Sequence, residues 1–358
     1  MPTVVYIDDE PEEFASALRE LSLDVRGFRD DELKAAAAEA PDADLLVLDY
    51  FYGRPDADEA ELSDETGLTT FEKVRRKLRD RRPPTVLVSG HLEEALEGVR
   101  QRPHVAALQL GVESVRSKSA QDVVALASAS ATLRGVHKEG VDFDEWLDEL
   151  CMKCLELDSS VEWYRVARRH VNGAQPPLFV EGTTWQVFAR GVLAWLGQAV
   201  MPYPSFLVSD RQVAVRLGIR AEHFVKWWEG DASGEIAEKL QTTLYTGPLS
   251  DGSRRWWRAG CDMIAWEYAQ RSDSPATQIS KDMGLDDDAV LPFEEPVVVF
   301  NADLEETEDA AEAVECVRAR DEHFPPDAAP AWVRIEDARF DRLLREKVVV
   351  DDRSELEQ

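Results

Sequence analysis

The sequence predicts an α/β doubly wound domain over residues 1–133, a mostly α-helical domain over residues 140–271 and a small α/β segment over residues 293–358. Three observations predict this order. Apolar runs of strand length in the first region each end in a polar residue, apolar residues recur at helical spacing in the second, and strand-like and helix-like stretches alternate in the third. A chain of 358 residues is long enough for two or three domains.

Polar side chains close the apolar runs of the first region, which are Thr3–Ile7, Asp44–Leu48 and Thr85–Val88. Asp8 and Asp9 follow the first run, Asp49 the second and Ser89 the third, and Lys118 lies further along the chain. In parallel α/β sheets, functional groups gather at the carboxyl ends of the strands. A carboxylate there can attack a phosphoryl donor and become an aspartyl phosphate. Mg²⁺ suits such a site because it binds a few carboxylates together with phosphate oxygens and waters.

This ordered set resembles the receiver domain of two-component response regulators, a flavodoxin-like fold, over roughly the first 130 residues. The resemblance implies that Asp49 is the phosphoacceptor. It also implies that Asp9 binds Mg²⁺ directly and that Asp8 binds it mostly through water. The backbone carbonyl of Phe51 would complete the protein's share of the metal site, together with Asp49.

By the same resemblance, Lys118 would neutralise the phosphoryl oxygens as a point charge, and Ser89 would move to hydrogen-bond the phosphoryl group. Two positions depart from the family pattern. Val115 stands where an aromatic residue is usual, and Ser119 follows the lysine where proline is usual. These departures leave open a pseudo-receiver in which Asp49 is never phosphorylated.

The segment after Asp49 is unusual because residues 54–66 are rich in Asp and Glu and make this loop about ten residues longer than is typical of the family. An acidic loop beside the acceptor repels a phosphodonor unless it points away or meets a basic partner. A solvated insertion and a regulatory lid are the two interpretations.

Composition limits the classes of function. The net charge is -30, which disfavours extended wrapping of nucleic acid, although residues 140–270 carry 13 basic and 18 acidic side chains and are closer to neutral. No apolar run approaches the ~18 residues that cross a membrane, so we expect a cytoplasmic protein with no membrane partner. The four cysteines lack the pattern of a disulfide framework, and packed, reduced thiols are expected.

The helical region contains a segment, residues 209–228, that resembles the helix-turn-helix motifs of bacterial regulators. Ser209 or Asp210 would cap its first helix, and Gly218 would occupy a turn position that favours a positive φ. The second helix would present its exposed residues to the major groove of DNA. These residues are Arg220, Ala221, Glu222, Val225 and Lys226. Three further helices are expected near residues 141–157, 159–171 and 184–200.

Two adjacent tryptophans lie between arginines in the stretch Arg254-Arg255-Trp256-Trp257-Arg258. The arginines could contact phosphates or a protein partner, and tryptophans can stack on bases. The tryptophans can equally fasten a helix to the core of a small domain, which is the interpretation we favour. A mixed use, with buried tryptophans and arginines facing a partner, is also open.

Residues 272–292 are polar and acidic and are expected to form a linker. Beyond them the patterns predict strands at residues 296–300, 332–335 and 348–350, and helices at residues 304–321 and 340–344. No function can be assigned to this last segment from its sequence.

The chain contains no nucleophile–histidine pair and no glycine-rich phosphate loop, so no enzyme activity is expected beyond the self-phosphotransfer and autodephosphorylation of a receiver. The expected function is that of a response regulator, phosphorylated on Asp49 by a histidine kinase, which switches a DNA-binding output. The alternative is an effector or adaptor that binds a protein through the same C-terminal region. A homodimer is a further expectation of the resemblance.

Overall fold

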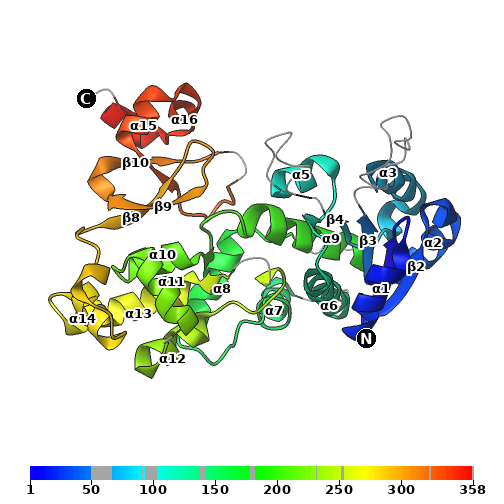
Figure 1. Ribbon diagram of the computed structural model, residues 1–358, viewed down its shortest axis with the longest axis horizontal. Coiled ribbons are helices and arrows are strands. Elements are labelled where there is room, and N and C mark those ends of the chain that lie inside the picture. The colour runs from blue at the N-terminus through cyan, green and yellow to red at the C-terminus, as the bar shows by residue number, and fades with distance from the viewer. Residues whose placement is uncertain are drawn as a thin grey trace. The chain divides into compact units, whose positions relative to one another are not determined.

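The computed structural model describes residues 1–49, 67–90, 92, 103–137, 142–177, 182–230, 232–250, 254–321 and 324–356. The contacts between residues divide the chain into two compact units (Figure 1). The first unit comprises Met1–Glu156, Pro176–Pro202 and Gly247–Gly252. The second unit comprises Leu157–Gln175, Tyr203–Thr246 and Ser253–Gln358.

The first unit contains a five-stranded parallel sheet in the order β2-β1-β3-β4-β5. This order is that of a flavodoxin-like fold and is compatible with a receiver, as the sequence predicts. The strands are β1 (Thr3–Ile7), β2 (Asp24–Phe28), β3 (Leu45–Asp49), β4 (Thr85–Ser89) and β5 (Ser114–Ser117). The helices of this part are α1 (Pro11–Glu20), α2 (Leu33–Glu39), α3 (Gly67–Leu78), α5 (Pro103–Leu110) and α6 (Ala120–Val136).

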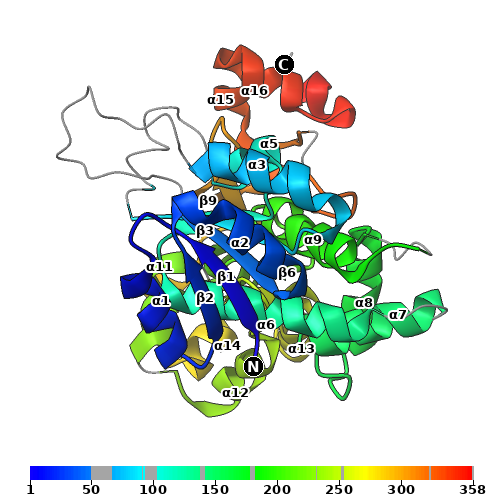
Figure 2. The ribbon, with the colours of Figure 1, turned by 90° about the vertical axis from the view of Figure 1, so that its right-hand side faces the viewer.

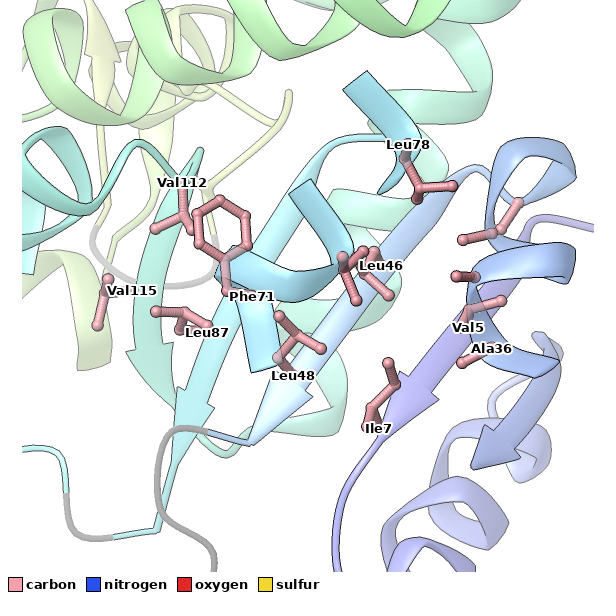
Figure 3. Close-up of a cluster of buried hydrophobic side chains, with 14 of the residues drawn as sticks. Val5, Ile7, Ala36, Leu46, Leu48, Phe71, Leu78, Leu87, Val112 and Val115 are labelled. Carbon is pink, nitrogen blue, oxygen red and sulfur yellow. The ribbon is translucent and has the colours of Figure 1, made fainter. Parts of the chain in front are cut away.

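Helices cover both faces of this sheet (Figure 2). On one face, side chains of α2, α3 and α5 pack against alternate residues of the strands, and Figure 3 shows this core around Leu46, Leu48 and Phe71. The opposite residues of β1, Val4 and Tyr6, are also fully buried. Because both faces are covered, β1, β3 and β4 are nearly continuous apolar runs, as expected of buried parallel strands.

The first unit also contains helices from the predicted helical domain. These are α7 (Phe143–Glu149), the π-helix η5 (Leu150–Cys154), α9 (Trp185–Trp195) and the π-helix η6 (Leu196–Val200). Helix η5 and helix α9 contact α6, and η6 contacts α5. The two compact units therefore differ from the domains 1–133 and 140–271 of the sequence analysis. Helical periodicity shows that a helix has a buried face, but it does not show which core that face joins.

The second unit begins with helices gathered around a short two-stranded sheet. The helices are α8 (Tyr164–Gly173), α10 (Asp210–Arg216), α11 (Ala221–Gly230), α12 (Gly234–Thr243), α13 (Arg258–Arg271) and α14 (Pro275–Asp282). Strand β6 (Leu207–Val208) pairs antiparallel with β7 (Trp256–Trp257). Trp256 and Trp257 are 0% and 2% exposed, which confirms the expectation that these tryptophans belong to the core.

The rest of the second unit is a mixed four-stranded sheet in the order β10-β11-β8-β9. Its strands are β8 (Pro296–Phe300), β9 (Glu306–Glu312), β10 (Cys316–Ala319) and β11 (Ala331–Arg334). Two short helices, α15 (Ile335–Phe340) and α16 (Arg342–Lys347), and the 3-10 helix η10 (Val350–Leu356) follow. The helix predicted at residues 304–321 is wrong, because pairing with β8 and β11 makes two strands there. Of the strand predicted at residues 348–350, only an isolated antiparallel bridge between Val348 and Ala319 is present, because η10 begins at Val350.

The segment 272–292 is not a linker, since it contains α14 and the 3-10 helix η8 (Asp287–Ala289). Ile279 of α14 and Met283, which directly follows this helix, are buried in the same core as the helices α10 to α13. All four cysteines are free and buried, as the sequence analysis expects. Within the described part of the chain, no helix combines the length and apolar character needed to span a membrane.

Candidate functional site

The ends of three strands bring the predicted phosphoacceptor residues to one edge of the parallel sheet. Asp8 directly follows β1, Asp49 ends β3 and Ser89 ends β4. The backbone N–H of Lys118, just after β5, donates to the carbonyl of Ser89 at 2.9 Å. The parallel register therefore carries four residues that are far apart in the sequence to neighbouring positions.

Lys118 joins two of the carboxylates. Its Nζ donates to Oδ2 of Asp8 at 2.8 Å and to Oδ2 of Asp49 at 2.8 Å. The side chain of Lys118 is 27% exposed, whereas that of Asp8 is 2% exposed. One ammonium group thus lies between two largely buried carboxylates, which would otherwise repel each other.

Hydrogen bonds and burial act in opposite directions on these groups. Burial raises the pKa of Asp8, but hydrogen bonds with Asp9, Lys118 and Tyr6 outweigh it, and the net pKa is well below its usual range. Burial alone would lower the pKa of Lys118. Its hydrogen bonds to Asp49 and Asp8 have the larger, opposite effect, so the net pKa is raised above its usual value. Asp8 and Lys118 are therefore both charged at neutral pH.

The fit of this site to Mg²⁺ rests on Asp8 and Asp49. Among the described residues no group of three or more His, Cys, Asp or Glu side chains is arranged to hold a metal ion. The oxygens of Asp8 and Asp49 nevertheless converge on one cationic nitrogen. Because Mg²⁺ is commonly bound by one or two carboxylates together with waters and phosphate oxygens, two converging carboxylates are compatible with it.

The remaining predicted members of the site are placed in part. Asp9 is half-buried, and its Oδ1 accepts a hydrogen bond from the backbone N–H of Glu10 at 3.0 Å. Ser89 is 1% exposed. Phe51 and the acidic loop at residues 54–66 lie outside the described residues.

Two aromatic residues beside Lys118 are absent from the sequence-based site. The hydroxyl of Tyr6 donates to Oδ2 of Asp8, and the Nζ of Lys118 lies 5.8 Å from the centre of the Tyr6 ring. It also lies 5.5 Å from the centre of the Phe14 ring. A usable signal exists in the sequence, because residues two apart in a strand point to the same face, and Tyr6 precedes Asp8 by two.

The predicted helix-turn-helix segment has the expected local conformation. Ser209 is the N-cap of α10, where its hydroxyl accepts from the N–H of Gln212 at 3.2 Å, and Gly218 has a φ of 73°. Five apolar residues of the segment are buried in the core of the second unit. They are Val213, Leu217, Ile219, Phe224 and Trp227.

Helix α11, the predicted reading helix, lines one wall of a cleft of about 980 Å³. All five residues predicted to face DNA lie in that lining, namely Arg220, Ala221, Glu222, Val225 and Lys226. Strand β9 contributes acidic residues to the same cleft, Glu308 and Asp309. Arg220 also bonds to the segment before β8, because its Nε donates to the carbonyl of Asp288 at 2.9 Å.

The three predicted contact arginines of the Arg-Trp stretch are engaged within the second unit. Arg254 forms ion pairs with Asp210 at 3.3 Å and Glu229 at 3.1 Å. Arg258 pairs with Asp262 at 3.4 Å. Burial lowers the pKa of Arg255. A phosphate would have to compete with these acids for Arg254 and Arg258.

Comparison with known proteins adds no assignment. No protein-family model matches the chain, and no curated protein matches it. The flavodoxin-like sheet and the geometry at its edge are therefore the observations from which function can be argued.

Proposed function

We propose that this chain is a response regulator whose first unit accepts a phosphoryl group on Asp49. The observation that carries the proposal is the convergence of Asp8 and Asp49 on Nζ of Lys118, 2.8 Å from each. Strand ends that gather two acids and a cation at one point resemble a site for transfer of a dianionic group.

In the proposed reaction, an oxygen of Asp49 attacks the phosphorus of a phosphohistidine on a partner histidine kinase. The new O–P bond forms as the P–N bond breaks, and the leaving imidazole takes up a proton. Lys118, already beside Asp49, would turn toward the phosphoryl oxygens and balance their charge. Ser89, at the end of the neighbouring strand, would donate its hydroxyl to the same group.

Asp8, Asp9 and Asp49 would hold Mg²⁺, with the carbonyl of Phe51. When bound, the metal would reduce repulsion between the incoming phosphoryl group and these carboxylates. Asp8 is fixed for this role by its own contacts, since its Oδ1 accepts from the N–H of Glu10 at 3.1 Å.

The proposal is tested by incubating the full chain with a small-molecule phosphodonor, such as acetyl phosphate, and Mg²⁺. Intact mass spectrometry should find one added phosphoryl group in the parent chain and none in Asp49→Asn. Asp42→Asn is the matched control, because Asp42 is an exposed carboxylate of the same unit. Equal phosphorylation of Asp49→Asn and the parent chain would contradict the assignment.

For the output we propose DNA binding through α10 and α11, the helix-turn-helix segment of residues 209–228. The N-cap at Ser209, the turn at Gly218 and the buried apolar positions support this choice. Genomic DNA fragments should bind at a discrete site, more weakly as salt rises, with and without a beryllofluoride mimic of phosphorylation. Arg220→Ala should weaken that binding, whereas Arg165→Ala, an exposed arginine of the same unit, should not.

A protein-binding output is the second candidate, and the cleft is the observation that favours it. The reading residues of α11 share that cleft with the acids of β9. Major-groove reading needs this helix face to be open to a duplex, because the groove must receive the whole helix. Absence of site-specific DNA binding in both phosphorylation states would favour a protein partner over DNA.

A further inference from the structure

Tyr6 lies under the phosphoacceptor site. It is the fourth residue of β1, and its side chain is 0% exposed. Because side chains alternate along a strand, Tyr6 points to the same face of the sheet as Asp8. Its ring lies 5.3 Å from that of Phe14 on α1, so the aromatic part packs on the α1 side of the sheet.

The hydroxyl of Tyr6 is a buried polar group, and such groups are normally hydrogen-bonded. It donates to Oδ2 of Asp8, the same oxygen that accepts from Nζ of Lys118. A carboxylate oxygen has two lone-pair directions, so these two donors use both. The other oxygen, Oδ1, accepts from the N–H of Glu10 at 3.1 Å.

The ring of Tyr6 contacts the same lysine. Nζ of Lys118 lies 5.8 Å from the ring centre of Tyr6 and 5.5 Å from that of Phe14, within the range of cation–π attraction. Tyr6 therefore acts on Lys118 in two ways, through its ring and through the oxygen of Asp8 that they share.

We propose that Tyr6 is a positioning residue that holds Asp8 against Lys118 and thereby limits the access of a divalent cation to Asp8. This inference rests on the proposed function, in which Asp8 contributes to the Mg²⁺ site. A cation, or a water bound to it, that approaches Oδ2 of Asp8 must displace either the hydroxyl of Tyr6 or the ammonium of Lys118. Tyr6 would thus set the metal affinity without touching the metal.

The test is a calorimetric titration of the full-length chain with Mg²⁺ in the parent and in Tyr6→Phe. The substitution keeps the ring and removes only the hydroxyl, so one lone pair of Asp8 becomes available. We expect a dissociation constant about tenfold lower in Tyr6→Phe, equal to about 1.4 kcal/mol. An unchanged or higher dissociation constant would overturn the inference.

Tyr268→Phe is the matched control, because its hydroxyl also donates to a carboxylate, Oδ2 of Asp282, at 2.7 Å. That pair lies in the second unit, so its loss should leave the Mg²⁺ affinity unchanged. Asp8→Asn should bind Mg²⁺ more weakly than the parent. Thermal unfolding of each variant shows that the fold is retained.

A metal-free readout separates failure of the inference from failure of the proposed function. Acetic anhydride should modify Lys118 faster in Tyr6→Phe than in the parent, and faster still in Tyr6→Leu, which also removes the ring. If the parent shows no saturable Mg²⁺ binding, the metal part of the proposed function and the limit on cation access fail together. The modification rate then decides separately whether Tyr6 holds Asp8 against Lys118. Equal rates in the parent and both variants would overturn that positioning role.

Discussion

The edge of the parallel sheet in the first unit and the helix pair in the second unit use charged residues in opposite ways. At the sheet edge, Lys118 bonds to two acids that lie 110 and 69 residues away in the sequence. In the second unit, Arg254 bonds to acids of α10 and α11, and Arg258 bonds to Asp262 within its own helix, α13. The relative position of α10 and α11 is instead fixed by close apolar packing around the turn at Gly218.

The sheet edge is thus defined by its charged groups, whereas the helix pair is defined by the fit of its apolar side chains. Several buried charges at one point are costly, and groups with strongly shifted pKa values cluster at functional sites. Partly exposed ion pairs around an apolar core need no functional role, since they contribute little to stability. The sheet edge is therefore the better-supported functional site, and the helix pair is defined mainly by its packing.

The largest expected effect is on the charged site. If Asp49 accepts a phosphoryl group as proposed, Lys118→Ala should slow the transfer by about 10²-fold or more, a typical cost of removing one positioned group that stabilises developing charge. Mass-spectrometric time courses with acetyl phosphate measure this rate. Lys153→Ala, which removes an exposed lysine paired with Glu149, should react like the parent. A parent-like rate in Lys118→Ala would remove the distinction between the two sites.

The next largest effect is expected on stability, at the turn between α10 and α11. Gly218→Ala should destabilise the second unit by about 3 kcal/mol, from the strain of a positive φ together with overpacking. Gly218 has a φ of 73°, and an added Cβ would lie 2.5 Å from that of Ala276. Gly230→Ala, where an added Cβ meets nothing within 4 Å, is the control. Urea unfolding measures the free energy of unfolding of the parent and of both variants. Equal free energies for Gly218→Ala and Gly230→Ala would show that the turn tolerates a side chain.

A third prediction concerns the acids of β9 that share the cleft with α11. If α11 reads DNA, the double substitution Glu308→Gln and Asp309→Asn should tighten DNA binding about tenfold, because it removes two negative charges beside the reading helix. Glu315→Gln combined with Asp337→Asn makes the same charge change at exposed positions elsewhere in the unit. Equal tightening by both pairs would reduce the effect to net charge.

The smallest effect is expected at an ordinary ion pair. Hydrogen bonds with Arg318 lower the pKa of Asp352, and the shortest joins Arg318 Nη2 to Asp352 Oδ1 at 2.6 Å. A lowered pKa in the folded state gives stability that is present above the unfolded pKa and is lost as the pH falls through the folded pKa. Asp352→Asn should therefore cost about 1 kcal/mol at pH 7. The cost should begin to fall below about pH 4, the usual pKa of an Asp, and should vanish only below the lowered pKa of the folded carboxyl. Unfolding curves across pH measure it, and a constant cost would contradict the ion-pair origin.

The sequence was informative about the sheet edge and less so about the packing of the helices. Asp8, Asp49 and Ser89 stand at the ends of apolar runs, and strand register alone brings such residues together. The sequence does not single out Tyr6, because a tyrosine inside an apolar run resembles an ordinary core residue. Its role depends on the hydroxyl, which only the position of Asp8 reveals.

The acidic stretch from Leu304 shows why local pattern failed in the C-terminal segment. Its Glu residues favour helices, and both Glu and Asp are depleted in strands. However, Leu304 has a positive φ of 59°, and β9 then pairs antiparallel with β8 through partners such as Val297 and Ala311. Pairing with a neighbouring strand decides whether such a stretch becomes a helix or a strand, and the local sequence does not show that neighbour.

The buried cysteines have a practical consequence. Burial raises the pKa of Cys154 and Cys261 to about 12 and that of Cys316 to about 11, so these three side chains present almost no thiolate to an alkylating reagent while the chain is folded. Cys154 belongs to the first unit, and Cys261 and Cys316 belong to the second. Peptide-resolved alkylation would therefore time the opening of each unit separately, with reporters that the natural sequence already supplies.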